Sequence, residues 1–144
     1  MPKILIGIDT GVNTGFAVAF DHGEGGVLQK VESLSITRAM QSVLEYEDEH
    51  DLKDIMLYIE DARKRTWFTG GREKFQGVGS VKRDAQIWED WCTEQGLNFK
   101  MIHPAANATK KKVADFTRMT GWTGRTNEHA RDAAMLVFKR YWKA

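Results

Sequence analysis

The chain has little of what stabilises secreted or membrane-embedded proteins. Its single cysteine, Cys92, excludes an internal disulfide and a cysteine-based zinc cluster. This residue lies in an apolar stripe, so we expect a buried, unreactive thiol. No apolar run approaches the roughly 18 residues of a membrane span, and a strand is predicted to begin near residue 3, which leaves no room for a signal peptide. We therefore expect no membrane association and a cytoplasmic, reducing location.

Net charge is also nearly absent, at +1, but the charges are unevenly distributed. Residues 45–54 carry six acidic side chains against one lysine, whereas residues 63–83 carry seven basic side chains against one glutamate. Such an asymmetry is typical of a protein that meets a polyanion on one side only. The length of 144 residues predicts one domain with a core of its own.

Hydrophobic periodicity predicts an α/β chain without linkers, repeats or low-complexity segments. Expected strands cover residues 3–9, 16–20, 27–34, 54–60 and 98–102, and expected helices cover residues 37–49, 80–95, 109–120 and 127–142. For the second of these helices, Ser80 is the expected N-terminal cap and Gly96 the expected end. Residues 61–79 are predicted to form a long basic loop. The stripe with Trp88 and Trp91 fits either the core or a dimer face.

Three segments far apart in the chain place acidic side chains where a metal could bind. Asp9 and Glu60 each end an apolar run, as expected for buried strands that deliver a functional group to the end of a sheet. His129 and Asp132 are three residues apart on a predicted helix, so their side chains share one face. Carboxylates on neighbouring strand ends, opposite such a helix, form the oxygen-rich site that divalent cations need for phosphodiester hydrolysis.

Less specific interpretations exist for each of these residues. A strand-terminal aspartate beside glycines, as at Asp9, is often turn chemistry alone, and it also resembles the first phosphate loop of actin and Hsp70-type ATPases. Those ATPases need two such lobes in a much longer chain, so length excludes them. Asp61 should point to the opposite face from Glu60 and be solvated or support the site from outside. Glu128 is expected to lie in the first turn of its helix, where the helix macrodipole favours an acidic side chain, and not to bind a metal.

The order of elements and three motifs resemble the RuvC-type Holliday-junction resolvases of the ribonuclease H-like superfamily, with the short length of the bacteriophage-encoded members. The motifs are Gly7-Ile8-Asp9-Thr10-Gly11-Val12-Asn13-Thr14-Gly15, Ile59-Glu60 and His129-Ala130-Arg131-Asp132-Ala133-Ala134. Between them, Ile102-His103-Pro104, Lys110-Lys111-Lys112 and Thr120-Gly121 resemble further family segments. The resemblance implies a five-stranded mixed sheet, with three antiparallel strands and then two parallel ones, flanked by helices. The stretch after Glu60 departs from the family, because it has no clear equivalent of the aromatic residue that probes the junction.

By position, the resemblance assigns the catalytic and metal-binding roles to Asp9, Glu60, His129 and Asp132. Asp9 would bridge two Mg²⁺ or Mn²⁺ ions, Glu60 and Asp132 would each hold one side, and His129 would orient a ligand or assist the attacking water. The implied substrate is a four-way or otherwise branched DNA, cut by a homodimer in a bacterial or phage-infected cell. A ribonuclease H-type enzyme acting on RNA–DNA hybrids, or a branched-DNA-binding module without cleavage, remain the alternatives.

The basic loop sets large aromatic residues among its cations. Such an arrangement suits stacking on bases together with phosphate contacts, although charge runs often only solvate a surface, and Trp67 could instead pack under the protein. The residues expected to contact DNA are Arg63, Lys64, Arg65, Trp67, Phe68, Arg72, Lys74 and Lys82, with Lys110, Lys111 and Lys112 at the start of a later helix.

Overall fold

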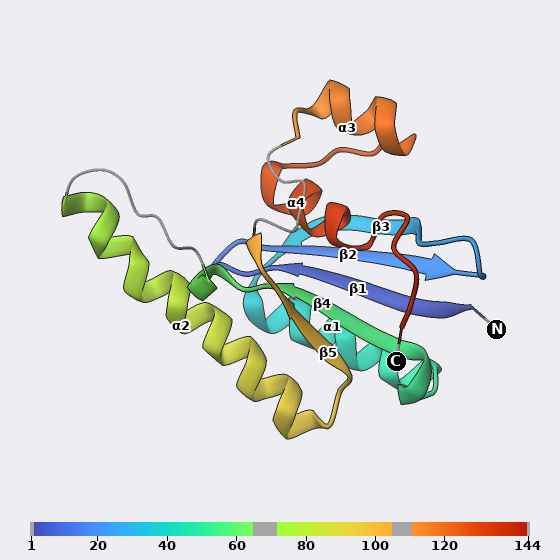
Figure 1. Cartoon of the computed structure of the whole chain (residues 1–144), viewed down its shortest axis with the longest axis horizontal. Helices are drawn as coiled ribbons and strands as arrows, with labels where there is room; N and C mark the ends of the chain where they lie inside the picture. The colour runs from blue at the N-terminus through green and yellow to red at the C-terminus, as the bar shows by residue number, and fades with distance from the viewer. Residues whose placement is uncertain (1, 65–71, 105–110, 144) are drawn as a thin grey trace.

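A computed structural model of the chain describes residues 2–64, 72–104 and 111–143 (Figure 1). Its strands are β1 (Lys3–Asp9), β2 (Thr14–Asp21), β3 (Val27–Leu34), β4 (Ile55–Glu60) and β5 (Phe99–Ile102). The α-helices are α1 (Ile36–Glu49), α2 (Arg72–Gln95), α3 (Val113–Thr120) and α4 (Glu128–Val137), with two short 3-10 turns, η1 (Leu52–Asp54) and η2 (Ala62–Lys64), on either side of β4. No helix among the described residues is long and apolar enough to cross a membrane.

The five strands form one sheet in the order β3-β2-β1-β4-β5. β1 and β3 are antiparallel to β2, whereas β4 is parallel to both β1 and β5. This arrangement confirms the expected mixed sheet of three antiparallel strands followed by two parallel ones. β1 and β4 lie at its centre, which explains why their sequences are almost continuously apolar.

Helices cover both faces of the sheet, α1 and α2 on one side and α4 on the other (Figure 1). Alternate residues of each strand serve the two faces. In β1, Ile4, Ile6 and Ile8 pack with buried Trp88 of α2, whereas Leu5 packs with α4. Trp88 is fully buried, so it belongs to the core and not to a dimer face. Cys92 is buried in the same cluster, and burial raises the pKa of its thiol to about 12, as expected for an unreactive cysteine.

Three glycines on the opposite face bring α4 unusually close to the sheet. A Cβ atom built on Gly15 of β2, on Gly7 of β1 or on Gly26, just before β3, would lie less than 3.0 Å from a backbone carbonyl oxygen of α4. Those three carbonyls belong to His129, Ala133 and Val137. Their spacing of four residues places them along one side of the helix. The absence of a side chain at these three glycines therefore allows the backbone of α4 to pack directly against the sheet.

The beginning of α2 corrects the sequence prediction. This helix begins at Arg72, so Ser80 lies inside it and is not its cap. Residues 72–79 of the predicted loop are therefore helical, and residues 62–64 form η2. The helix ends as predicted, with Gly96 in the left-handed conformation (φ 68°).

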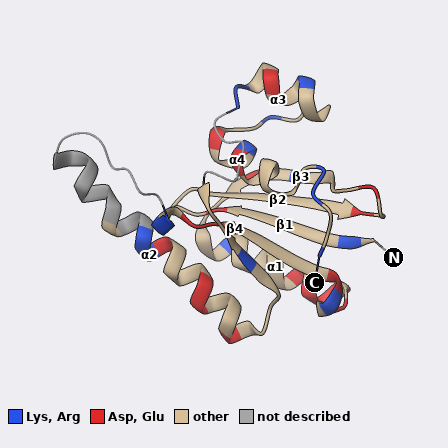
Figure 2. Cartoon of the chain, viewed as in Figure 1, with Lys and Arg blue, Asp and Glu red and all other residues tan. Residues whose placement is uncertain are grey.

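Acidic side chains gather at the amino end of β4 (Figure 2). The acidic side chains of residues 45–54 gather where α1 ends and β4 begins (Figure 2). There Lys3 of β1 forms an ion pair with Asp54. β4 thus has an acidic cluster at its amino end, and it carries Glu60 at its carboxyl end.

Asp21, at the end of β2, fastens the C-terminal tail to the sheet. One carboxylate oxygen accepts hydrogen bonds from the backbone N–H groups of Gly23 and Gly25, at 2.7 and 3.0 Å, and the other accepts from that of Trp142, at 2.9 Å. Burial acts to raise the pKa of Asp21, but these three hydrogen bonds outweigh it and leave the pKa below its usual value of 3.8. The ionised form of Asp21 is therefore favoured by folding.

We expect Asp21→Asn to lower the free energy of unfolding at neutral pH by about 1–3 kcal/mol, because an amide NH₂ would face a backbone donor. Since the pKa of Asp21 is lowered in the folded state, its contribution is present above pH ~3.9 and is lost as the pH falls through the folded-state value. Urea unfolding from pH 7 to pH 2 should thus show the two proteins converging in acid. Glu24→Gln, at an exposed position in the same turn, should change stability by less than about 0.5 kcal/mol. Equal stability of Asp21→Asn and the unsubstituted protein would contradict the assignment.

Candidate active site

Asp9 and Glu60 lie side by side at the carboxyl ends of two neighbouring parallel strands. The register pairs Ile8 of β1 with Ile59 of β4, so each carboxylate residue follows a paired position. Both belong to the set of alternate positions that faces α4, since Leu5 and Tyr58 of the same sets pack with that helix. Glu60 is 2% exposed and the Asp9 side chain 14% exposed. Two carboxylates are thus held in a largely dry environment.

Helix α4 brings the third predicted residue against the first. Nδ1 of His129 lies 3.1 Å from an Oδ2 oxygen of Asp9. Asn127 caps the helix by accepting a hydrogen bond from the N–H of Ala130 at 2.9 Å, which fixes where the first turn begins. The helix end nearest Asp9 is therefore its N-terminus, whose partial positive charge favours an anionic group.

Asp132 follows His129 after three residues of α4 and is 7% exposed. The predicted residues therefore come from β1, β4 and α4, as expected. Within the described ranges, no three histidine, cysteine or acidic side chains already form a cluster that could hold a metal ion. The donor set itself is three carboxylates and one imidazole, which suits Mg²⁺ or Mn²⁺ better than softer metals.

Arg131 has a role that the sequence did not reveal. Its side chain donates from Nε to the carbonyl oxygen of Lys111, at 2.7 Å, and from Nη1 to the hydroxyl of Thr126, at 3.0 Å. The residue is only 9% exposed. It therefore holds the segment before α3 next to the helix that carries His129. Lys111 and Lys112, expected to contact phosphates, are placed near the candidate site by this contact.

A second network surrounds Asp61, the neighbour of Glu60. Nε and Nη2 of Arg63 donate to the two carboxylate oxygens of Asp61, at 2.7 and 2.9 Å. Nη1 of Arg63 donates to Gln86 and Glu89 of α2, at 2.7 and 3.0 Å. Burial opposes ionisation of Asp61, but Arg63 outweighs it and holds the pKa of that carboxyl below its usual value. Asp61 is thus an ion-pair partner, not a solvated carboxylate, and it ties the end of β4 to α2.

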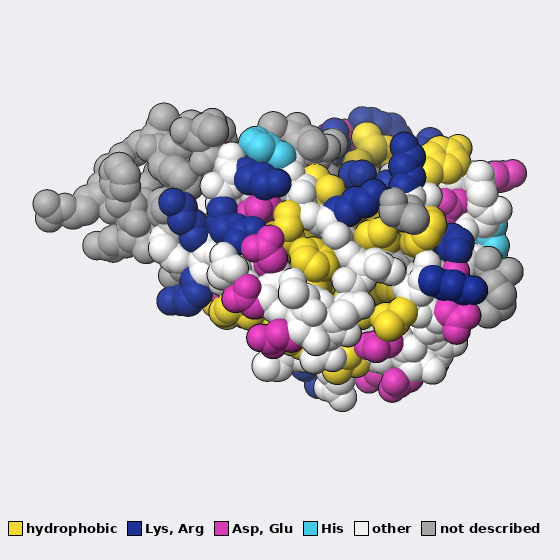
Figure 3. Space-filling model, turned by 60° about the horizontal axis from the view of Figure 1, so that its bottom comes forward, with side chains coloured by type: hydrophobic (Ala, Val, Ile, Leu, Met, Phe, Trp, Pro, Cys, Tyr) yellow, Lys and Arg dark blue, Asp and Glu magenta, His cyan; other side chains and the backbone are white. Residues whose placement is uncertain are grey.

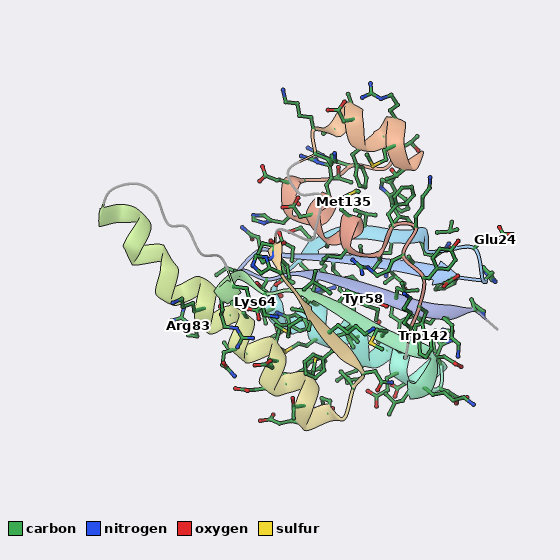
Figure 4. The ribbon with its side chains drawn as sticks, in the orientation of Figure 1. Glu24, Tyr58, Lys64, Arg83, Met135 and Trp142 are labelled. Atoms are coloured by element: carbon green, nitrogen blue, oxygen red, sulfur yellow. The ribbon has the colours of Figure 1, made fainter. Side chains whose placement is uncertain are left out.

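These bonds use most of the donors of Arg63. The side chain is 22% exposed and fixes η2, so we now expect this structural role for Arg63, while its phosphate contact stays an untested prediction. Lys64, the next residue, is exposed and lies near Arg83 at the same end of the molecule (Figure 4). Lys82 is also exposed on α2. Of the other expected DNA contacts, Arg65, Trp67, Phe68 and Lys110 lie outside the described residues, as do the side chains of Arg72 and Lys74.

The paired variants Arg63→Gln and Lys64→Gln separate the two roles. Arg63→Gln should lower the free energy of unfolding by about 1–3 kcal/mol, because it leaves buried Asp61 without its cation. It should leave the salt dependence of DNA binding unchanged. Lys64→Gln should leave stability within about 0.5 kcal/mol and reduce the slope of log K against log salt by about 0.9 if it contacts a duplex phosphate. Chemical denaturation measures the stability, and anisotropy titrations between 50 and 200 mM salt measure the slope. A changed slope for Arg63→Gln and a stability loss for Lys64→Gln would contradict the two assigned roles.

Comparison with known proteins finds the architecture but no sequence family. No protein-family model matches the chain, and neither does any curated protein. Among solved structures, RuvC of Thermus thermophilus is similar, with a TM-score of 0.50 over 92% of this chain and 90% of that one, at 16% sequence identity. A similarity at this identity concerns the fold. Together with the sheet order, it confirms the expected ribonuclease H-like fold.

Proposed function

We propose that the protein is a divalent-metal-dependent endonuclease that hydrolyses phosphodiesters in branched DNA, with four-way junctions as its preferred substrate. The observation that carries the proposal is the meeting of three elements: Asp9 and Glu60 end adjacent strands, and His129 of α4 contacts Asp9. The fold shared with a RuvC protein supports the same reaction class.

In the proposed site, Asp9, Glu60 and Asp132 would hold one or two Mg²⁺ or Mn²⁺ ions, with His129 as a further ligand or proton-transfer group. Bound cations of this kind lower the pKa of water and neutralise the leaving oxygen. The protein then has three tasks. Its carboxylates supply the negative charge that would bind the cations, and the buried strand ends exclude bulk water. Helix α4 orients the imidazole of His129 against Asp9.

Substrate selection falls to the basic residues around the site. The hydrogen bond from Arg131 of α4 to the carbonyl oxygen of Lys111 keeps Lys111 and its neighbour Lys112 beside that helix. Lys64 is exposed near the carboxyl end of β4. Phosphate contacts from such residues position DNA without reading its sequence. In a homodimer, which the resemblance to resolvases implies, the two active sites would act on opposed strands of one junction.

Competition between substrates tests the proposal. A four-way junction, a linear duplex and an RNA–DNA hybrid of matched length are each incubated with the protein in Mg²⁺ and in Mn²⁺. We expect cleavage of the junction in preference to the other two. Preferential cleavage of the hybrid would replace the proposal by a ribonuclease H-type activity, and junction binding without cleavage in either metal would leave a DNA-binding module.

His129 offers a graded test of the same site. His129→Asp should retain measurable junction cleavage, because a carboxylate can also bind a metal or handle a proton. His129→Ala should lose most of it, by roughly 10²-fold, the scale of one positioned proton-transfer group. Initial rates under single-turnover conditions measure both variants. Equal rates for His129→Ala and the unsubstituted protein would leave a site of three carboxylates only.

A further inference from the structure

A basic groove beside the C-terminal tail is not part of the catalytic cluster. We propose that it binds the sugar-phosphate backbone of the DNA substrate within a few nucleotides of the cleavage position. This inference rests on the proposed function, and it adds a binding site that neither the motifs nor the expected DNA contacts include.

The groove lies between the end of α4, the strands β4 and β5, and the tail that follows α4. Its volume is about 380 Å³. Tyr58 of β4 and Lys100 of β5 are paired in the sheet and form one wall, while Met135 and Phe138 come from α4 and its end. Figure 4 shows Tyr58 on the sheet between Met135 and the tail residue Trp142. α4 packs mainly over β1, β2 and β3, which leaves this side of the sheet open.

The charge of the groove is of one sign. Four of its lining residues are cations, Lys100, Lys139, Arg140 and Lys143, and none of the described lining residues is acidic. In the space-filling view, basic side chains gather beside hydrophobic ones on the upper right of the face shown (Figure 3). Cations concentrated in a concave surface attract a polyanion more strongly than the same charges spread over a convex one.

The ring of Tyr58 positions a cation at the groove. The residue is 2% exposed, and its hydroxyl is buried with the backbone N–H of Lys143 facing it. The guanidinium carbon of Arg140 lies 4.7 Å from the centre of the Tyr58 ring, which holds this cation against the wall of the groove. The buried ring thus keeps the guanidinium of Arg140 at the groove, where it can meet a phosphate oxygen.

The groove and the candidate active site share strand β4. Tyr58 and Glu60 are two residues apart in β4 and face the same side of the sheet. Their backbones are therefore separated by about 6.6 Å. A DNA strand advances about 3.4 Å per nucleotide along a duplex, so the groove begins roughly two nucleotides from a phosphate bound at Glu60.

The tail that forms the outer wall is fixed before any ligand binds. Gly26 exchanges two backbone hydrogen bonds of 2.8 Å with Lys139 and Arg140. Beyond them, Trp142 is held by Asp21, and Nζ of Lys3 lies 4.5 Å from the centre of the Trp142 ring. Ordering this wall therefore costs little upon binding.

Nucleic acid fits the groove better than an acidic peptide does. Besides cations, the lining includes Tyr141, which is 55% exposed and reaches solvent beside Arg140 and Lys143. An exposed aromatic ring among cations can stack on a base while its neighbours contact phosphates. A peptide carboxylate would use the cations but gain little from the ring.

The test combines charge removal with a direct probe. Lys100→Gln/Lys143→Gln is compared with the control Lys30→Gln/Lys53→Gln, whose lysines lie outside the groove, after thermal unfolding confirms that both are folded. Junction binding in EDTA should show a salt slope smaller by about 0.9 for each lost duplex phosphate contact, or about 0.7 for single strands, in the groove variant only. In the unsubstituted protein, a short oligothymidylate should shift the amide NMR signals of Lys100 and of residues 139–143.

The outcomes separate this site from the proposed function. An unchanged slope together with unshifted groove signals would overturn the groove, while junction cleavage would still support the nuclease. Absence of DNA binding by the unsubstituted protein would overturn both. Polyglutamate that shifts the groove signals as strongly as oligothymidylate would reject nucleic acid as the specific occupant.

Discussion

Asp9→Asn and Glu60→Gln should each abolish junction cleavage while binding of the junction survives. Each change keeps the size of the side chain and removes one negative charge from the strand ends where a cation would bind. Loss of about 4 kcal/mol of transition-state stabilisation corresponds to roughly a thousandfold in rate. Single-turnover cleavage measures the loss, and anisotropy of a labelled junction in EDTA measures the binding that should remain.

Asp54→Asn is the matched control, because Asp54 immediately precedes β4, at the end of the strand opposite Glu60, and pairs with Lys3. Its cleavage rate should equal that of the unsubstituted protein. A second readout does not depend on activity: added Mn²⁺ should raise the melting temperature of the unsubstituted protein and of Asp54→Asn, but not that of Asp9→Asn. Cleavage within tenfold of the unsubstituted rate in either active-site variant would refute the metal site.

The sequence was sufficient to predict the strands that carry the catalytic candidates. β1 and β4 are central and parallel, so both of their faces are buried and their sequences read as apolar runs that stop at a carboxylate. The helix motif was equally clear, because His129 and Asp132 share a face in any helix. The sequence could not predict the direct contact between His129 and Asp9, because it depends on how closely α4 approaches the sheet.

Long-range partners account for what the sequence did not predict. Arg63 belongs to a run of cations, and only the fold shows that Glu89, 26 residues later, binds its guanidinium together with Asp61. The start of α2 was missed because Gly77 and Gly79 each disfavour a helix by about 1 kcal/mol. The packed part of α2, which includes Trp88 and Cys92, forms a nucleus from which the helix extends through those glycines.

Gly15 shows the same limitation most clearly. From the sequence it was one of several turn glycines after Asp9, whereas in the structure it lies in β2, paired with Asp9 and directly beneath the carbonyl of His129. Its role is to allow close approach of a helix that is more than 100 residues away in the chain. No local pattern carries that information.

Gly15→Ala should therefore displace α4 and impair both stability and cleavage. The added methyl group would collide with the backbone of His129, and it would also lie 3.0 Å from the Cβ of Asp9. Backbone atoms of a packed helix cannot rotate away as a flexible side chain can. We expect the free energy of unfolding to fall by about 3 kcal/mol, at the upper end of the usual cost of overpacking.

Cleavage should fall further than the unfolded fraction explains, because a displacement of about 1 Å in a catalytic group can cost about 10²-fold in rate. Rates are measured at a temperature where chemical denaturation shows the variant to be fully folded. Gly7→Ala, beneath Ala133, should destabilise the protein similarly. Gly79→Ala is the control: a Cβ there meets nothing within 4 Å, so within helix α2 it should stabilise by about 0.5–1 kcal/mol and leave cleavage unchanged. A folded Gly15→Ala protein that cleaves at the unsubstituted rate would show that the position of α4, and with it His129, does not govern the reaction.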